Sequence, residues 1–436
     1  MLPRYFYYFD LALHSFRRNR VLTGLMVVAI ALGIGASMTT LTVLYVLSGD
    51  PLPGKSDRVY YVQLDAAGKD DFTPGAEPQE QSTRFDAEAL LRAKRADRQA
   101  MMTGGDVAIE PERAGLAPFT GDGRFTSADF FPMFDVPFAQ GGGWTAAEDE
   151  ARARIAVISK ELNDKLFGGG NSVGRTLRLD QHEFRIVGVL DRWRPTPHFY
   201  DPYIGRYSQV ELVYVPFSTS VELKFGHSGM MDCWGDSKGD SRSLAAPCTW
   251  IQFWVQLDTP AKASAYRDFL VRYSEQQRSA GRYERPPNVR LRNVMEWLDF
   301  KKIVPSDVRL QTWLAFGFLV VCLINTIGLL LAKFLRRSSE IGVRRALGAS
   351  RRAIFTQFLV EAGTVGLVGG VIGLGLAWLG LWAVRHQPTE YAPVAELDLV
   401  MLATTFALAL AASVLAGLVP AWRACQISPA LQLKSQ

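Results

Sequence analysis

A glycine-rich stretch at residues 169–176, GGNSVGRT, has the residue types and spacing that could bind a phosphate group. The phosphate-cradling loop with this spacing needs a lysine where Arg175 stands, a strand before the loop and a helix after it. The pattern around this stretch instead predicts a helix before it and a strand after it. We therefore expect no nucleotide here, and because the sequence offers no other candidate loop, we expect this chain to bind no cofactor itself.

Two cysteines in the long polar part of the chain, Cys233 and Cys248, are the next candidates for chemistry. If that part lies outside the cytoplasm, a disulfide is expected, and closing such a loop contributes about 3 kcal/mol. A metal site with His227 as a further ligand is the competing interpretation. The absence of a paired CxxC motif and of enough ligands for a closed zinc site favours the disulfide, so we expect no metal. Cys322 and Cys425 are expected to be free thiols.

Two polar residues, Asn325 and Glu361, interrupt long apolar runs. An amide in hydrocarbon usually bonds to another helix, worth about 1 kcal/mol, so we favour packing over a transport role for Asn325. An ionised carboxylate inside a bilayer costs about 3 kcal/mol and normally needs a partner. We therefore expect Glu361 to form a structural salt bridge near the inner face, since a proton relay would lack a second acid. Overlapping small-residue pairs then predict close packing against neighbouring spans: Gly366 with Gly370, and Gly369 with Gly373.

An arginine-rich segment lies between the second and third apolar runs. Its single acid between residues 336 and 352 is Glu340. Gly348 can end a first helix and Ser350 can cap the next, so the segment predicts a short helix, a turn and a new helix. A rigid connector of this kind can transmit force, whereas the alternative is a positively charged anchor at the inner face of the membrane.

Four apolar runs, each long enough to cross a bilayer, divide the chain. The first exceeds the apolar core of about 7–15 residues found in signal peptides, so we expect an uncleaved span. The basic flanks place both termini and the arginine-rich segment in the cytoplasm. The expected division is a cytoplasmic amphipathic lead-in helix (1–20), span one (21–47), an outer domain (48–308), span two (309–333), the arginine-rich connector (334–352), span three (353–384), a short outer loop (385–396), span four (397–419) and a cytoplasmic tail (420–436).

The outer domain has the mixed composition of a folded, water-exposed domain. Its patterns predict helices at 87–101 and 261–279 and strands at 59–64, 155–159, 176–179, 184–189 and 250–257. The fold class expected is therefore a membrane α-helical protein with four transmembrane helices and a large α+β extracytoplasmic domain inserted between helices 1 and 2. The net charge of +5 comes from basic residues beside the apolar runs, which argues for membrane topology and against nucleic-acid binding.

The sequence EIGVRRALGASRRAIFTQFLVEA at 340–362 resembles the signature of MacB/FtsX-type ABC transporter permeases. Residues 125–144 and 154–190 are similar to the extracytoplasmic core domain of the same family, whereas 194–250 departs from it and is expected to be an insert. In that family the arginine-rich segment contacts a separate ATPase. The resemblance therefore implies a set of ATPase-coupling residues: Glu340, Arg344, Arg345, Gly348 and Ala349.

The resemblance implies a permease subunit of the bacterial inner membrane, not an enzyme, that passes ATP-driven movement to its periplasmic domain for export. ATP and Mg²⁺ would bind the partner ATPase. The implied partners are that ATPase, a second permease copy or paralogue, membrane lipids and, for tripartite exporters, a membrane-fusion protein and an outer-membrane channel. The alternatives are an ATP-gated regulator of cell-wall hydrolases, whose outer domain is usually smaller, and a sensor with a periplasmic ligand-binding domain, for which no signalling domain follows the last span.

Overall fold

The computed structural model describes residues 20–70, 72–111, 115–207, 210–388, 391–392 and 399–425. The chain divides into two compact units, an outer unit at Gly49–Ile303 and a helical unit made from the segments on either side of it in sequence. The predicted lead-in helix (1–20) lies outside the described residues except for Arg20, as do residues 426–436 of the predicted tail (420–436) and half of the predicted outer loop (385–396).

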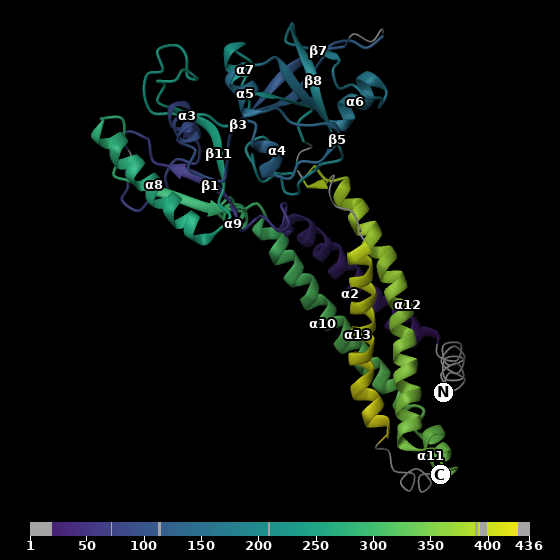
Figure 1. Ribbon diagram of the computed structural model, residues 1–436. Coiled ribbons are helices and arrows are strands. Elements are labelled where there is room, and N and C mark those ends of the chain that lie inside the picture. Colours follow the sequence, from purple (N-terminus) through teal and green to yellow (C-terminus); the bar gives the residue numbers. More distant parts are fainter. Residues whose placement is uncertain are drawn as a thin grey trace. The chain divides into compact units, whose positions relative to one another are not determined.

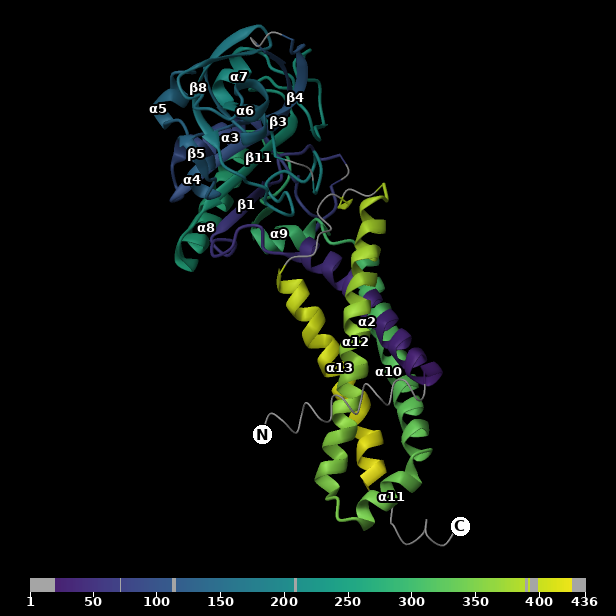
Figure 2. The same ribbon diagram turned by 90° about the vertical axis from the view of Figure 1, so that its right-hand side faces the viewer.

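The described residues of the helical unit form four long apolar helices and one short helix. Their bounds are α2 (Arg20–Ser48), α10 (Ser306–Leu335), α11 (Ser338–Ala346), α12 (Arg351–Arg385) and α13 (Leu399–Cys425). The shortest of the four apolar stretches, Val400–Arg423, has 24 residues, which exceeds the ~20 that a bilayer requires. Helices α2 and α13 each pack against both α10 and α12, and the four lie side by side in Figure 1 and Figure 2.

Within the ranges that the structure describes, the outer unit is built on one mixed sheet of 12 strands with helices beside it. The strands are β1 (Val59–Leu64), β2 (Ser82–Thr83), β3 (Arg98–Glu110), β4 (Phe119–Thr126), β5 (Phe138–Gly141), β6 (Ile155–Ile158), β7 (Thr176–Leu179), β8 (His182–Leu190), β9 (Val213–Pro216), β10 (Asp232–Cys233), β11 (Cys248–Gln256) and β12 (Val289–Asn293). The helices are α3 (Arg84–Ala93), α4 (Phe130–Met133), α5 (Ala146–Glu150), α6 (Lys160–Phe167), α7 (Phe217–Glu222), α8 (Pro260–Ser279) and α9 (Val294–Phe300).

The strand order is β12-β1-β11-β3-β4-β9-β6-β8-β5, with β2 and β10 on β11 and β7 joining β3 to β8. Most neighbours are antiparallel, but β4–β9 and β6–β8 are parallel. Strands β6 and β11 are buried almost throughout, as expected for central strands covered on both faces. The predicted fold class is confirmed: four apolar helices, with a large mixed domain between the first and the second.

The glycine-rich stretch at 169–176 follows helix α6 and precedes strand β7, as predicted. Strands β7 and β8 pair as an antiparallel hairpin after it. This order is the reverse of the strand–loop–helix order that a phosphate-cradling loop requires. The stretch therefore serves as a turn of the sheet.

The predicted helix at 87–101 is wrong in its second half. Helix α3 ends at Ala93, and Lys94 adopts the left-handed conformation with φ of 47°. Strand β3 then begins at Arg98 and pairs with β11 on one side and β4 on the other. The local sequence of this segment favours a helix. Pairing with a strand on each side and burial stabilise a strand there instead.

The segment 194–250, expected to be an insert, belongs to the core of the outer unit. It contributes β9, which lies between β4 and β6 in the sheet. It also supplies both partners of a fully buried arginine on β4, because Arg124 donates to Asp201 (Nη1–Oδ2, 2.6 Å) and to Glu211 (Nε–Oε1, 2.8 Å). Burial alone would raise the pKa of the Glu211 carboxyl, but the Arg124 guanidinium lowers it to about 2.

A disulfide joins Cys233 on β10 to Cys248 on β11, where the two strands pair. It closes a loop with a sequence separation of 15. A cross-link over such a loop restricts the unfolded chain and contributes about 3 kcal/mol.

We predict that non-reducing mass spectrometry of the full chain will find Cys233 and Cys248 in one linked peptide. Replacing both with serine should lower the free energy of unfolding of the outer unit by about 3 kcal/mol, measured by denaturant titration with tryptophan fluorescence. Reducing agent should destabilise the native chain and leave the double variant unchanged. An unlinked peptide from freshly purified protein would contradict the prediction.

Candidate functional site

The arginine-rich segment forms helix α11, a tight turn and the first turn of α12. Gly348 lies in the turn with φ of +95°, a conformation that glycine adopts without steric cost. The Ala349 amide donates to the Arg344 carbonyl at 3.0 Å, which closes the end of α11. The Ser350 hydroxyl then accepts from the Ala353 amide at 3.2 Å and caps α12. The two helices are therefore joined by a hydrogen-bonded turn.

Side chains reinforce this connection between α11 and α12. The Arg344 guanidinium donates to Glu340 Oε1 at 2.9 Å, one helical turn away, and to Gln357 Oε1 of α12 at 3.1 Å. The first is a half-exposed pair, worth only a few tenths of a kcal/mol because solvent screens it. The same guanidinium therefore links α11 to α12 through its contact with Gln357. Of the predicted coupling residues, Glu340 and Arg344 are brought together, whereas Arg345 is half-buried farther along α11.

Helix α11 carries an exposed apolar patch that the sequence interpretation missed. Ile341 is buried in the core of the helical unit, whereas Val343 and Leu347 are 56% and 82% exposed. The latter two are four residues apart and therefore share one face at this end of α11. Such a pair of anchors is typical of a helix that inserts into a groove on a partner. The surrounding arginines made this patch hard to recognise in the sequence. The four-residue spacing of Val343 and Leu347 is the pattern that could have revealed it.

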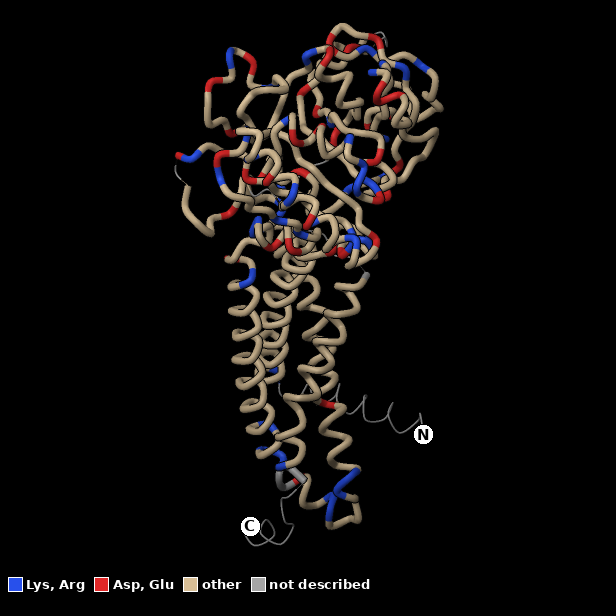
Figure 3. Tube along the Cα trace, turned by 60° about the vertical axis from the view of Figure 1, so that its left-hand side comes forward, with Lys and Arg blue, Asp and Glu red and all other residues tan. Residues whose placement is uncertain are grey.

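A buried ion pair joins three of the long helices. Lys333 Nζ of α10 lies 2.6 Å from Glu361 Oε1 of α12 and 3.4 Å from Thr23 Oγ1 of α2. Arg337 Nη1 lies 3.5 Å from Glu361 Oε2. Both members of the main pair are buried, so each neutralises a charge that would otherwise be costly in an apolar surrounding. Figure 3 shows a group of basic residues at the end of the helices that carries α11, whereas Arg309 of α10 and Arg385 of α12 lie at the opposite ends of their helices.

Asn325 is not part of this network. It is exposed at the surface of the helical unit, beside the exposed Ile324 and Val321. The structure therefore separates the two polar residues that the sequence singled out: Glu361 points into the bundle, and Asn325 faces outward.

The glycines of α12 lie where neighbouring helices approach most closely. A Cβ added to Gly366 would lie 1.9 Å from Ser413 Cβ, and one added to Gly370 would lie 2.6 Å from Ala409 Cβ, both on α13. The other pair, Gly369 and Gly373, faces α2, since a Cβ on Gly373 would lie 3.1 Å from the Ala31 carbonyl oxygen. The two overlapping glycine pairs thus serve two different helix contacts.

The described part of the chain contains no group of three or more His, Cys, Asp or Glu side chains arranged to hold a metal ion. His227 Nδ1 lies 2.9 Å from Thr103 Oγ1, and both candidate cysteine ligands are in the disulfide.

Two family models match this sequence and together extend over most of it. Residues 23–272 match the MacB-like periplasmic core domain, and residues 313–429 match the FtsX-like permease C-terminal domain. The first match includes the whole of 194–250, in agreement with the place of that segment in the sheet.

Curated relatives align along nearly the whole chain. The macrolide export ATP-binding/permease protein MacB of Azoarcus sp. (strain BH72) is 25% identical over 98% of this chain. The pyoverdine export ATP-binding/permease protein PvdT of Pseudomonas fluorescens (strain Pf0-1) is 24% identical over 96% of it. The chain spans 59% and 58% of the length of these two relatives.

Two solved structures are similar to part of the chain. The periplasmic region of MacB from Actinobacillus actinomycetemcomitans covers 58% of this chain at 13% identity, with a TM-score of 0.36 and 96% of that structure aligned. The extracellular domain of the noncanonic ABC-type transporter YknZ from Gram-positive bacteria covers 54% at 13% identity, with a TM-score of 0.34 and 100% of that structure aligned.

We predict that Lys333→Met and Glu361→Leu, made singly, each destabilise the helical unit by roughly 3–5 kcal/mol, because each leaves a buried charge without its main partner. The double variant should recover most of the loss, since apolar side chains suit the site. The stability of all three variants is measured by thermal unfolding in detergent, with size-exclusion chromatography used to monitor the loss of folded protein. Strictly additive losses would show that the two residues do not depend on each other.

A second prediction concerns the close approach of α12 and α13. Gly366→Ala should destabilise their packing by about 1–3 kcal/mol, because the added methyl group overlaps Ser413. Gly375→Ala is the matched control, since a Cβ there meets nothing within 4 Å. Alanine is also the better helix former, so the control should be neutral or slightly stabilising in the same assay. Equal effects of the two changes would contradict the packing described.

Proposed function

Because the chain belongs to the permease family that joins a MacB-like periplasmic core domain to an FtsX-like C-terminal domain, we propose that it is the membrane subunit of an ABC exporter. In this proposal it receives movement from a separate cytoplasmic ATPase and passes that movement to its outer unit. The proposal rests on one observation: helix α11 exposes two apolar side chains and is hydrogen-bonded to α12 through Arg344 and Gln357.

The proposed topology follows from the charges. Lys333 lies in the last turn of α10, directly before the arginine-rich segment, and basic residues favour the cytoplasmic side. The outer unit is then periplasmic, and both termini are cytoplasmic. The Cys233–Cys248 disulfide supports an oxidising compartment for the outer unit. The lipid-facing surface is supplied by exposed apolar side chains such as Trp313 and Val371.

The ATPase is proposed to bind the patch formed by Val343 and Leu347, with the α11 arginines beside it. Two buried aliphatic side chains of this kind can contribute about 1.5–3 kcal/mol each. ATP and Mg²⁺ would be bound by that partner.

Movement of α11 would reach the spans through the hydrogen-bonded turn at Gly348 and the contact of Arg344 with Gln357. The Lys333–Glu361 pair then couples α12 to α10, and Thr23 extends the contact to α2. The outer unit is connected in sequence to α2 at one end and to α10 at the other. Joint movement of these helices would therefore act on both ends of the outer unit at once.

We propose export of a periplasmic compound, pushed outward without passing through the bilayer. The names of the relatives, macrolide export and pyoverdine export proteins, support an amphipathic small molecule or siderophore as cargo. Two permease subunits, identical or paralogous, would act together. A membrane-fusion protein and an outer-membrane channel would complete the path to the outside.

We predict that Val343→Ala combined with Leu347→Ala abolishes co-purification with the ATPase and lowers its stimulation by the permease at least about tenfold, because the patch loses its buried anchors. Alanine favours helix, so α11 itself should persist. The control is Leu379→Ala, since Leu379 is a similarly exposed residue of α12 outside the patch.

Membrane insertion and the unfolding temperature should be unchanged in the double variant. Charge reversal of Arg344 and Arg345 should also remove stimulation while leaving insertion intact. Full ATPase binding and stimulation by both variants would contradict the proposed docking surface.

A further inference from the structure

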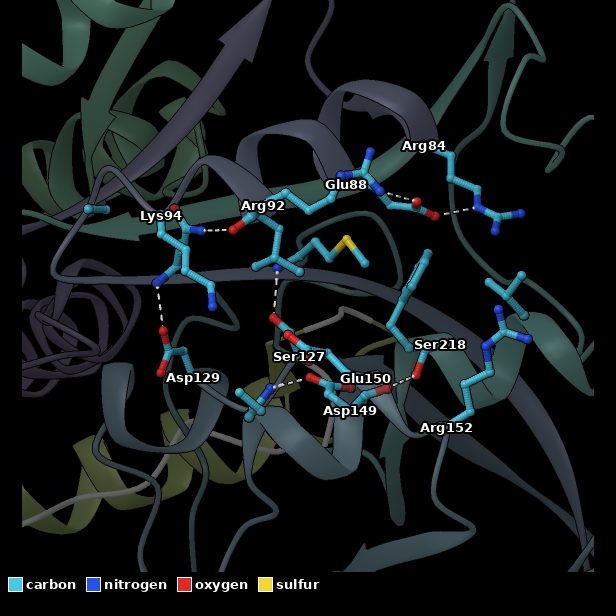
Figure 4. Close-up of a pocket in the computed structure, with 18 of the residues that line it drawn as sticks. Arg84, Glu88, Arg92, Lys94, Ser127, Asp129, Asp149, Glu150, Arg152 and Ser218 are labelled. Atoms are coloured by element: carbon cyan, nitrogen blue, oxygen red, sulfur yellow. Dashed lines mark hydrogen bonds and ion pairs between the residues drawn. The ribbon is translucent and has the colours of Figure 1, made fainter.

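The outer unit contains a cleft with a volume of about 750 Å³, between α3 and β3 on one side and α5 and α7 on the other. Figure 4 shows Arg84, Glu88 and Arg92 on one wall, with Asp149 and Ser218 opposite them. A cleft of this size matches those that enclose one drug-sized organic molecule. Neither the coupling surface nor the buried ion pair of the helical unit involves it.

Part of the lining is apolar. Leu91 and Met101 come from the α3–β3 side, and Phe217 and Val221 come from α7. Phe217 and Met101 also belong to the core of the outer unit, so this part of the lining is held in place by packing. An apolar body would therefore find a preformed surface here.

The basic side chains of the cleft are largely matched by acids. Arg84 and Arg92 both contact Glu88, at 2.8 and 3.3 Å, and Arg152 contacts Glu222 at 3.2 Å. Three further carboxylates, Asp129, Asp149 and Glu150, form no ion pair with a cationic side chain among the residues the structure describes. Asp129 and Asp149 instead accept backbone amide protons, from Gln99 at 3.0 Å and from Ala128 at 2.8 Å.

A buried amide supplies an independent indication of what the cleft binds. Gln99 is only 6% exposed, and its Nε2 donates to the Leu90 carbonyl at 3.2 Å. Its Oε1 is buried and has no hydrogen-bond partner within the described structure, and Gln99 is one of the residues that line the cleft. A buried acceptor without a donor is costly, so this atom favours a ligand that brings an N–H group.

The charges around Asp149 indicate the sign of that ligand. Burial, together with the neighbouring Asp129 and Glu150, raises the pKa of Asp149 to about 7. The further charged groups that line the cleft are Arg84, Glu88, Arg92, Lys94, Asp97, Arg152 and Glu222. A cation placed near the three carboxylates would relieve their mutual repulsion, whereas an anion would add to it.

We propose that this cleft binds an amphipathic organic amine, with its ammonium group among Asp129, Asp149 and the Gln99 carbonyl and its apolar body on Met101 and Phe217. The site lies wholly within the outer unit. Binding therefore requires neither the ATPase nor the docking patch on α11, and failure here would leave the proposed coupling untouched.

The test uses the full chain in nanodiscs of zwitterionic lipid and the fluorescent primary amine dansylcadaverine, titrated at pH 8. Asp149→Asn should weaken binding about tenfold, because it removes the charge but keeps an acceptor for Ala128. Gln99→Leu should also weaken binding severalfold. Glu275→Gln, an exposed acid of α8 outside the cleft, is the matched control and should leave the affinity unchanged.

The pH dependence separates a charge effect from a change of fold. Native protein should bind dansylcadaverine more tightly as the pH rises from 6 to 8, because Asp149 ionises while the amine stays protonated. Asp149→Asn should show a flat profile over this range. Circular dichroism of each variant should match that of the native chain.

Equal affinity for uncharged dansylamide, or unchanged binding in both cleft variants, would overturn the proposal. So would binding of trilysine without binding of dansylcadaverine, which would indicate a basic peptide of a partner protein as the occupant.

Discussion

The ion pair between Lys333 and Glu361 is the interaction on which the helical unit depends. A lone charge in an apolar bundle is costly, so each residue requires the other, and their contact fixes the rotation and height of α10 against α12. The Thr23 hydroxyl brings α2 to the same point. Close glycine contacts then hold α13 and α2 against α12. Movement of α12 by a partner therefore cannot leave α10 unaffected without breaking a buried charge contact.

The outer unit also contains a buried charge that is stabilised by ion pairs. Arg124 is buried with two carboxylates, and its guanidinium lies over the Tyr200 ring. Both carboxylates come from the segment 194–250, so this segment and β4 are fixed to each other. A unit built in this way can move as a body, which suits a role at the receiving end of a mechanical linkage.

The sequence was informative where one physical property dominated a whole segment. Uniform hydropathy defined the four spans, and strand-like runs located β1, β6, β7, β8 and β11. It misled where a tertiary contact decided the outcome: β3 was expected to continue a helix, because only its partner strands make it a strand. The tyrosine- and glycine-rich composition of 194–250 concealed β9. The need of Glu361 for a basic partner was foreseeable, but its choice of Lys333 depends on helix rotation. The cleft joins three distant segments and could not be foreseen.

The central claim is that movement received at α11 reaches the outer unit. It is tested most directly by double electron–electron resonance on the assembled transporter, with a spin label at position 275 on α8 of each permease copy. ATP is expected to shift the label-to-label distance, and the shift should disappear when Val343 and Leu347 are replaced by alanine. A distance that does not respond to ATP in the native assembly, or that responds equally without the two side chains, would contradict it.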